Sequence, residues 1–394
     1  MKCFMPHYSM VVWADGTYSV CCHSKRRYPL LNQDSDDLNE IIQSNFDIEM
    51  IKEMQSNNLE HTNCMKCNEN LGLKVHEFSD NLFTREELET LVQTPKIKYL
   101  HFSPTRKCNL ACRTCSSAFS TTFEKTFVNS TEFKVSSNEF PVEKTLNMID
   151  SVVADLKNFT FHGGEPLLYS GFYEILDLIS TKNKSCNIQL ITNGSFDLKK
   201  LGILDKLKNF ESVEIIFSLD GAKGLNEMIR TFANTDSILN NIDNIYSSED
   251  YKNIKIISHT TFSVFNILFI GELIDFFKKN KYSEKGVVFS SFILVDPFEY
   301  SIDVFSKNIR PFIIEYLRNN LIGAEDVFYK EIDKLILSLI SSLENKSPLP
   351  SVFRKNLVSN LDFKDEKTNI MLKDLIEDRI KKLLGKDGDL IDLL

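Results

Sequence analysis

The chain has 394 residues, a formal net charge of −9 and 42% hydrophobic residues, which is the composition of a globular protein with two or three domains. The negative charge and the lack of a long basic run argue against a nucleic-acid partner. No secretory signal and no run of about 18 apolar residues occur, so we expect a cytoplasmic protein that does not enter a membrane.

The N-terminal segment, residues 1–95, is rich in cysteine. Its stretch "SMVVWADGTYSVC" reads as strand, turn and strand, because Asp-Gly at 15–16 is a hairpin signal. Four cysteines flank this hairpin or follow it in a C-x2-C loop: Cys3, Cys21, Cys64 and Cys67. Four thiolates suit an iron–sulfur cluster or a structural zinc ion. Cys22 is an alternative ligand to Cys21, and unmetallated thiols are a further alternative.

From about residue 96, strand-like runs rich in Ile, Val, Phe and Thr alternate with helical stretches. Six runs are expected to be strands: 96–102, 158–162, 187–192, 212–219, 253–262 and 286–294. A repeated strand–helix pattern predicts a parallel sheet with helices outside it. In such folds the chemistry gathers at the carboxyl ends of the strands. We take 96–299 as the second domain.

Four motifs follow successive strands of this predicted sheet. A C-x3-C-x2-C run with Cys108, Cys112 and Cys115 follows the first strand, "GGEP" follows the second, "TNG" the third, and "SLDG" closes the fourth. Three thiolates leave one corner of a tetrahedral zinc site empty. A cubane cluster held by three cysteines instead keeps one iron free for a small chelating molecule. Cys186 lies in a later strand-like run and is expected to be a buried structural thiol.

The cysteine run and "GGEP", each after its strand, resemble the radical S-adenosylmethionine (radical SAM) superfamily over roughly residues 96–295. The resemblance implies an α/β fold with a partial (β/α)6 TIM-like barrel. It also implies a 4Fe–4S cluster on Cys108, Cys112 and Cys115, with SAM bound to the open iron. In this family the cluster cleaves SAM reductively to a 5′-deoxyadenosyl radical that abstracts hydrogen from substrate. The electron would come from an external donor such as flavodoxin or ferredoxin.

The resemblance assigns five residues to SAM binding: Gly163, Gly164, Glu165, Ser218 and Arg230. The Gly-Gly-Glu stretch matches the one that receives the SAM amine. Ser218 matches a residue that contacts the ribose or methionine part, and Arg230 matches an arginine that pairs the carboxylate. The position before the third cysteine is often aromatic in this superfamily, but here it is Thr114. Adenine would therefore need another apolar contact.

The N-terminal cysteine pattern resembles the SPASM and twitch extensions of radical SAM enzymes, which hold an auxiliary 4Fe–4S cluster. Such an extension normally follows the barrel, whereas here it precedes it. The resemblance implies an oxidoreductase or maturase that carries out a net oxidation of a small molecule or a peptide. The alternatives are a radical SAM enzyme with structural zinc in this segment and a non-catalytic metal-binding scaffold. Residues 300–394 are predicted to be an amphipathic helical extension.

Overall fold

The computed structural model describes residues 4–22, 24, 26–30, 35–44, 83–127, 139–321, 327–359 and 372–385. Three of the predicted metal ligands lie outside the described residues: Cys3, Cys64 and Cys67. Among the described residues, no helix combines the length and the apolar character that a membrane span needs.

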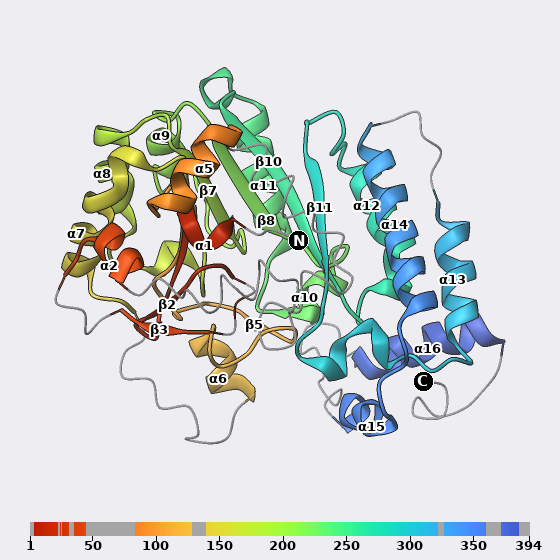
Figure 1. Ribbon diagram of the computed structural model, residues 1–394. Coiled ribbons are helices and arrows are strands. Elements are labelled where there is room, and N and C mark those ends of the chain that lie inside the picture. The colour runs from red at the N-terminus through yellow and green to blue at the C-terminus, as the bar shows by residue number, and fades with distance from the viewer. Residues whose placement is uncertain are drawn as a thin grey trace.

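A sheet of nine strands forms the centre of the described fold, in the order β11-β10-β8-β7-β6-β4-β1-β2-β3 (Figure 1). The strands from β11 to β1 all run parallel, and β2 and β3 are antiparallel additions. Their bounds are β1 Ser9–Trp13, β2 Thr17–Ser19, β3 Tyr28–Pro29, β4 Tyr99–Ser103, β6 Asn158–Phe161, β7 Asn187–Thr192, β8 Val213–Ser218, β10 Ile254–Phe262 and β11 Val288–Ile293. All six predicted strands are present, which confirms the parallel α/β architecture of a partial barrel.

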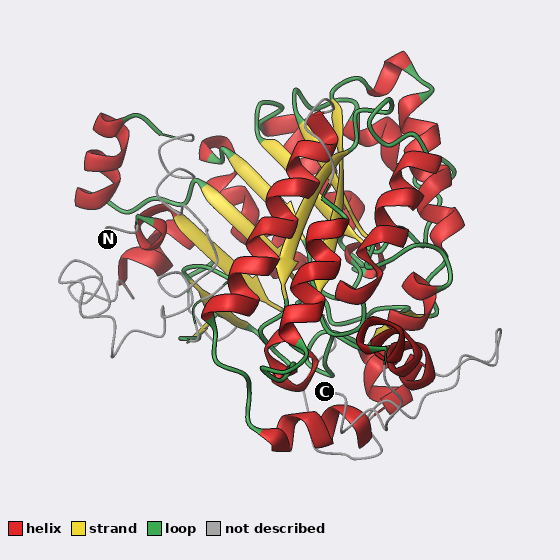
Figure 2. Ribbon diagram, turned by 90° about the vertical axis from the view of Figure 1, so that its right-hand side faces the viewer, coloured by secondary structure: helices red, strands yellow, loops and turns green. Residues whose placement is uncertain are grey.

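Helices lie outside the sheet (Figure 2). Those that connect or precede its strands are α1 Met5–Tyr8, α2 Leu38–Ser44, α5 Arg85–Gln93, α6 Thr121–Phe127, α7 Val142–Val152, α8 Phe172–Lys182, α9 Ile203–Leu207, α10 Leu225–Ile229, α11 Thr235–Tyr246 and α12 Ile270–Lys279. Buried and less buried side chains alternate along strands such as β8, where Ile215 and Phe217 are buried in the apolar core. The intervening Glu214 and Ser218 face the other side of the sheet and are only half-buried. This inner face carries the polar residues of the barrel.

Strand β1 brings the N-terminal segment into the barrel sheet. It pairs in parallel with β4, with Trp13 opposite Ser103. The predicted hairpin is confirmed, because β2 returns antiparallel to β1. Its turn needs a glycine, since Gly16 has a φ of 84°. The predicted boundary at residue 95 thus separates strands that belong to one sheet. Because β1 and β4 are parallel, the β1–β2 turn and the loop after β4 lie at the same, carboxyl edge of the sheet.

The C-terminal region is helical, as predicted. Its helices are α13 Arg310–Asn319, α14 Val327–Asn345, α15 Ser351–Ser359 and α16 Leu372–Leu384. Helix α14 packs against the edge strand β11, and α13 packs against both α14 and α16 (Figure 1). These helices therefore cover the β11 edge of the sheet, which would otherwise present unpaired backbone groups.

Arg310 joins the C-terminal helices through one buried guanidinium. The residue is 5% exposed. It donates hydrogen bonds to the carbonyl oxygens of Phe305 (2.8 Å), Leu343 (2.9 Å) and Asp303 (3.1 Å). Leu343 belongs to the last turn of α14, whose carbonyl groups have no partner within the helix. The side chain thus closes the end of α14 and ties it to α13.

We expect Arg310→Met to lower the free energy of unfolding by about 2–4 kcal/mol, because it leaves several buried carbonyl groups without donors. Urea unfolding would measure the change. Arg318→Met is the matched control, since Arg318 pairs with Glu344 at the surface with side chains 58% and 47% exposed. Its effect should stay within about 0.5 kcal/mol. Equal losses in the two variants would contradict the role of Arg310.

Candidate active site

The loop after β4 carries the three cysteines and brings them together. Cys112 lies in the short strand β5, Ala111–Cys112, which pairs antiparallel with β9, Arg230–Thr231. Cys112 stands opposite Arg230 in this register. The backbone N–H of Cys115 donates to the carbonyl of Cys112 at 3.0 Å, so a tight turn links these two cysteines. The sequence spacing and the β5–β9 pairing thus fix the trio locally.

The three thiols share a poorly solvated environment. Burial raises the pKa of Cys108, Cys112 and Cys115, that of Cys115 to about 11, and neighbouring thiols raise the pKa of Cys112 and Cys115 further. Such a trio stays protonated unless a positive charge compensates the thiolates. Bound iron supplies that charge, because a coordinating thiol is deprotonated outright. The donor set therefore fits an iron–sulfur cluster.

Hydrogen-bond donors surround the sulfur atoms of this loop. The N–H of Leu110 lies 3.4 Å from Cys108 Sγ, Asn193 Nδ2 lies 4.0 Å from the same sulfur, and Arg230 Nη1 lies 3.8 Å from Cys112 Sγ. Donors to sulfur are among the features that tune iron–sulfur clusters. No three His, Cys, Asp or Glu side chains of the described residues are arranged to hold a single ion. A cubane cluster does not need three ligands that converge on one ion, because each cysteine binds a different iron.

The glycines of "GGEP" pack against the cysteine loop. A Cβ atom on Gly164 would lie 2.3 Å from the carbonyl oxygen of Lys107, and one on Gly163 would lie 2.8 Å from that of Thr105. The backbone N–H groups of Gly164 and Glu165 donate to Thr105 and Lys107, both at 2.8 Å. The resemblance assigned these glycines to the stretch that receives the SAM amine. The structure shows that they allow the approach of the loop that carries the cysteines.

Glu165 connects the ends of two strands. The residue is completely buried, and its carboxylate accepts hydrogen bonds from Thr192 Oγ1 at 2.8 Å and from the backbone N–H of Asn193 at 2.9 Å. Burial raises its pKa to about 7, against the opposing effect of these hydrogen bonds. Asn193 in turn donates to Asn109 Oδ1 at 2.8 Å. "GGEP" and "TNG" thus form one hydrogen-bonded support for the cysteine loop, a role for Asn193 that sequence reasoning missed.

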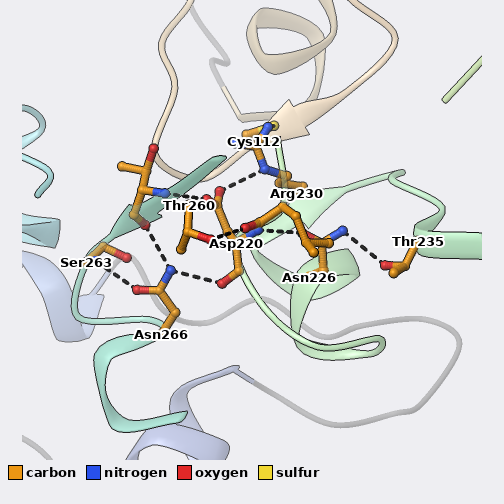
Figure 3. A network of polar contacts seen from close by, with 10 residues as sticks. Cys112, Asp220, Asn226, Arg230, Thr235, Thr260, Ser263 and Asn266 are labelled. Carbon is orange, nitrogen blue, oxygen red and sulfur yellow. Dashed lines mark hydrogen bonds and ion pairs between the residues drawn. The ribbon is translucent and has the colours of Figure 1, made fainter. Parts of the chain in front are cut away.

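Arg230 forms a buried ion pair beside the cysteines. Its Nε lies 2.8 Å from Oδ2 of Asp220, and the two side chains are 12% and 0% exposed (Figure 3). Burial acts to lower the pKa of Arg230, but the Asp220 carboxylate and the Cys112 thiol outweigh it and raise that pKa. Sequence reasoning missed this role of Asp220, because the Asp-Gly pair after β8 does not reveal whether its carboxylate is buried.

The inner face of the sheet is polar. Tyr99 and Thr160 hydroxyls lie 3.3 Å apart, Thr160 donates to Gln189 at 2.7 Å, and Gln189 donates to Glu214 at 2.7 Å. These hydrogen bonds cross β4, β6, β7 and β8. Nearer the carboxyl edge, Ser218 pairs in register with His259 of β10. His259 Nδ1 lies 3.1 Å from Ser290 Oγ of β11. The face that looks into the barrel thus offers groups for a polar molecule.

His162 lies on this inner face, next to two other rings. Its imidazole makes edge-to-face contacts with His101 at 4.2 Å and with Trp13 at 5.9 Å between ring centroids. Burial lowers the pKa of His162 to about 4. The imidazole is therefore neutral near pH 7, and its ring contacts place it inside the barrel.

We expect His162 to destabilise the fold in acid. Between pH 6.5 and 4 the unfolded chain binds a proton at His162 that the folded chain does not, so stability falls as pH falls through this range. At pH 5 the loss relative to pH 7 amounts to about 2 kcal/mol. Urea unfolding of wild type and His162→Gln at both values would show a smaller acid loss in the variant. The same loss in both proteins would contradict this assignment.

Trp13 connects the cysteine loop with the N-terminal segment. Its ring lies 5.9 Å from that of Phe119, which follows the cysteine loop, and the Arg27 guanidinium stacks 3.8 Å above it. Trp13 Nε1 and Arg27 Nη1 both donate to Ser19 Oγ, at 2.9 and 2.8 Å. Ser19 donates to the carbonyl of Cys21 at 2.9 Å. These contacts thus fix the backbone of Cys21 just after β2, the strand that pairs with β1.

Two family models match the chain. Residues 102–268 match the model described as "Radical SAM superfamily". This chain contains a radical SAM domain. Residues 3–68 match the SPASM iron–sulfur cluster-binding domain, and the two matches together span more than half of the chain. A 4Fe–4S cluster and SAM are the cofactors of the radical SAM domain, and the SPASM domain adds an auxiliary iron–sulfur cluster. In this radical SAM protein the SPASM domain precedes the radical SAM domain.

Curated relatives of this radical SAM protein include GTP 3′,8-cyclases from Helicobacter pylori. Those of strains 26695 and HPAG1 are each 28% identical to it over 155 residues. The match covers 39% of this chain and 43% of the relatives, so it spans less than half of their length.

Solved structures resemble the chain weakly. SuiB of Streptococcus suis bound to S-adenosylmethionine is 18% identical, with a TM-score of 0.41, over 73% of this chain and 61% of that one. A structure described as anSMEcpe with bound AdoMet and a peptide is 19% identical, with a TM-score of 0.39, over 56% of this chain and 57% of that one.

Proposed function

We propose that this protein is a radical SAM oxidoreductase or maturase that acts on a polar substrate, a small molecule or a peptide. The observation that carries the proposal is the assembly of Cys108, Cys112 and Cys115 beside a buried arginine at the carboxyl edge of the sheet. When bound, the cluster supplies the electron that divides SAM into methionine and a 5′-deoxyadenosyl radical able to take hydrogen from substrate. The electron comes from an external one-electron donor such as flavodoxin or ferredoxin.

The chain's own residues hold the cofactors in place. The three cysteines bind the cluster, and "GGEP" receives the amine of SAM. The close packing of Gly163 and Gly164 on the cysteine loop supports this, since it places the two segments side by side. Arg230 presents its remaining N–H groups to the SAM carboxylate. Ser218 contacts the ribose or methionine part from the end of β8.

The substrate lies against the inner face of the sheet in this proposal. His162 and His259 are turned to that face, and burial lowers the pKa of both below the usual value. Neutral imidazoles both donate and accept hydrogen bonds, so they can orient a polar substrate. Trp13 and Phe119 supply apolar surface at the same edge. They are candidates for the apolar contact that Thr114 does not give to adenine.

The N-terminal segment holds an auxiliary cluster that takes part in a net oxidation. Ser19 fixes the backbone carbonyl of Cys21, and we propose that Cys3, Cys64 and Cys67 complete the ligand set of Cys21. The parallel pairing of β1 with β4 supports this role, because it carries the segment to the cysteine loop despite its early place in the chain. The segments 1–95, 96–299 and 300–394 serve as the auxiliary, radical SAM and helical units.

Anaerobic purification, metal analysis and product detection test the proposal. We expect about eight irons per chain if both sites hold cubanes, and about four if the N-terminal site holds zinc. Addition of SAM and a strong reductant should then yield 5′-deoxyadenosine. A protein that contains no iron, or that loads iron and leaves SAM intact under reduction, would refute the enzymatic function.

A further inference from the structure

We propose that Asp220 is a positioning residue that fixes the Arg230 guanidinium against the sulfur of Cys112, and that this fixed cation raises the reduction potential of the SAM-binding cluster. This inference rests on the proposed function, because it requires a cluster on Cys108, Cys112 and Cys115. It assigns Arg230 an action on the cluster itself, beyond any contact with SAM.

Arg230 contacts both partners with different nitrogen atoms. Its Nε lies 2.8 Å from Asp220 Oδ2, and its Nη1 lies 3.8 Å from Cys112 Sγ (Figure 3). The planar guanidinium has a fixed fork of donors. Holding the Nε side therefore also sets the direction of the Nη1 side, toward the sulfur. The antiparallel pairing of β5 with β9 adds a second constraint, since it places the two backbones opposite each other.

Asp220 is itself held through one carboxylate oxygen and through its backbone. Its Oδ1 accepts a hydrogen bond from the backbone N–H of Thr261 at 2.8 Å. Its own N–H donates to Asn226 Oδ1, and its carbonyl accepts from Asn266 Nδ2, both at 2.9 Å (Figure 3). A completely buried carboxylate with these partners has no freedom to follow a moving arginine. The arginine must instead adapt to the carboxylate.

The energetics favour a functional reason for this pair. A buried ion pair contributes little net stability, because the cost of removing both charges from water offsets their attraction. The cluster becomes more negative when it takes up one electron from a reductant. A cation fixed beside a ligand sulfur stabilises that reduced state, since cluster potentials depend on net charge and on hydrogen bonds to sulfur. Reduction of this cluster is thereby made easier.

The variant Asp220→Asn distinguishes the positioning role of Asp220 from the effect of its negative charge on the cluster potential. Loss of a negative charge alone would favour the reduced cluster and raise its potential. The amide, however, must offer its oxygen to Thr261, because that backbone donor is buried there. Its NH2 group then faces Arg230 Nε, and two donors repel each other. The guanidinium should leave Cys112, so a positioning role predicts a lower potential in this variant.

The test is an anaerobic redox titration of the iron-loaded protein with dithionite, followed by electron paramagnetic resonance of the reduced cluster. A Cys64→Ala/Cys67→Ala background leaves only two of the four proposed auxiliary ligands, so that the SAM-binding cluster alone should be titrated. We expect Arg230→Met and Asp220→Asn each to reduce the ratio of reduced to oxidised cluster at a fixed potential at least about tenfold, or about 59 mV for one electron. Arg379→Met is the control, because it removes an equal charge from an ion pair that joins Arg379 of α16 to Glu272 of α12. It should leave the potential unchanged.

The outcomes distinguish this inference from the function on which it rests. A rise of the potential in Asp220→Asn, or no change in Arg230→Met, would overturn the inference while the loaded wild-type cluster leaves the proposed function intact. A wild-type protein that loads no cluster would overturn both. If Asp220→Asn does not fold, the Arg230→Met titration decides.

Discussion

Replacement of Cys112 by Ala is expected to remove the SAM-binding cluster and to abolish the formation of 5′-deoxyadenosine. Two cysteines remain on the loop, and they cannot hold three irons of a cubane. Iron analysis should show a loss of about four irons per chain. The loss of SAM cleavage should exceed the 10–100-fold that is typical when a residue that only supports a metal ligand is replaced.

Cys186→Ala is the matched control for Cys112→Ala. Cys186 is completely buried, and burial raises the pKa of its thiol to about 12. The control removes one thiol from the core and creates a small cavity, but it touches no ligand of the cluster. It should keep its iron and its SAM cleavage. A Cys112→Ala protein with the iron content of this control would show that the loop does not bind the cluster.

Gly164→Ala is expected to have the second-largest effect. The added methyl group would lie 2.3 Å from the carbonyl oxygen of Lys107 and 2.8 Å from its carbonyl carbon, and these are backbone atoms that cannot turn away. The cysteine loop must therefore shift. We expect a loss of about 1–3 kcal/mol in stability, as for other overpacked positions, and a loss of most of the iron. Urea unfolding and iron analysis of the same preparation measure the two effects.

Gly286→Ala is the control that distinguishes the steric clash at Gly164 from a general loss of stability through backbone strain. A Cβ atom on Gly286 would meet no heavy atom within 4 Å, although its φ of 65° makes alanine unfavourable there. We expect this control to cost about 1–2 kcal/mol and to retain its iron. If the two alanine variants lose iron to the same extent, the packing of "GGEP" on the cysteine loop does not control cluster loading.

The sequence predicted what depends on local patterns. The six strands of the barrel follow from runs of β-branched and aromatic residues, and the hairpin after β1 follows from Asp-Gly at 15–16. The cysteine spacing indicated in the same way that Cys108, Cys112 and Cys115 lie close together, and their role as cluster ligands stays a prediction. Each of these patterns lies within a few neighbouring residues, so it can be recognised in the sequence without knowledge of the folded structure.

The sequence did not predict what depends on distant partners. The pairing of β1 with β4 and that of Asp220 with Arg230 both arise from the folded sheet. Asp220 and its turn look alike in the sequence whether the carboxylate is exposed or buried. The assignment of the "GGEP" glycines to SAM binding stays a prediction, and their contact with the backbone near Lys107 is identified by the structure alone.

The pairing of β1 with β4 has a consequence for biosynthesis. The ribosome releases Ser9 long before it releases Tyr99, the residue that stands opposite it. The β1–β2 hairpin is therefore synthesised without its partner strand β4, and nearly a quarter of the polypeptide is made before β4 follows. Contacts between such distant positions form slowly. We expect the N-terminal thiols to reach their place only after translation has passed β4, so that metal delivery to them is a late event in maturation.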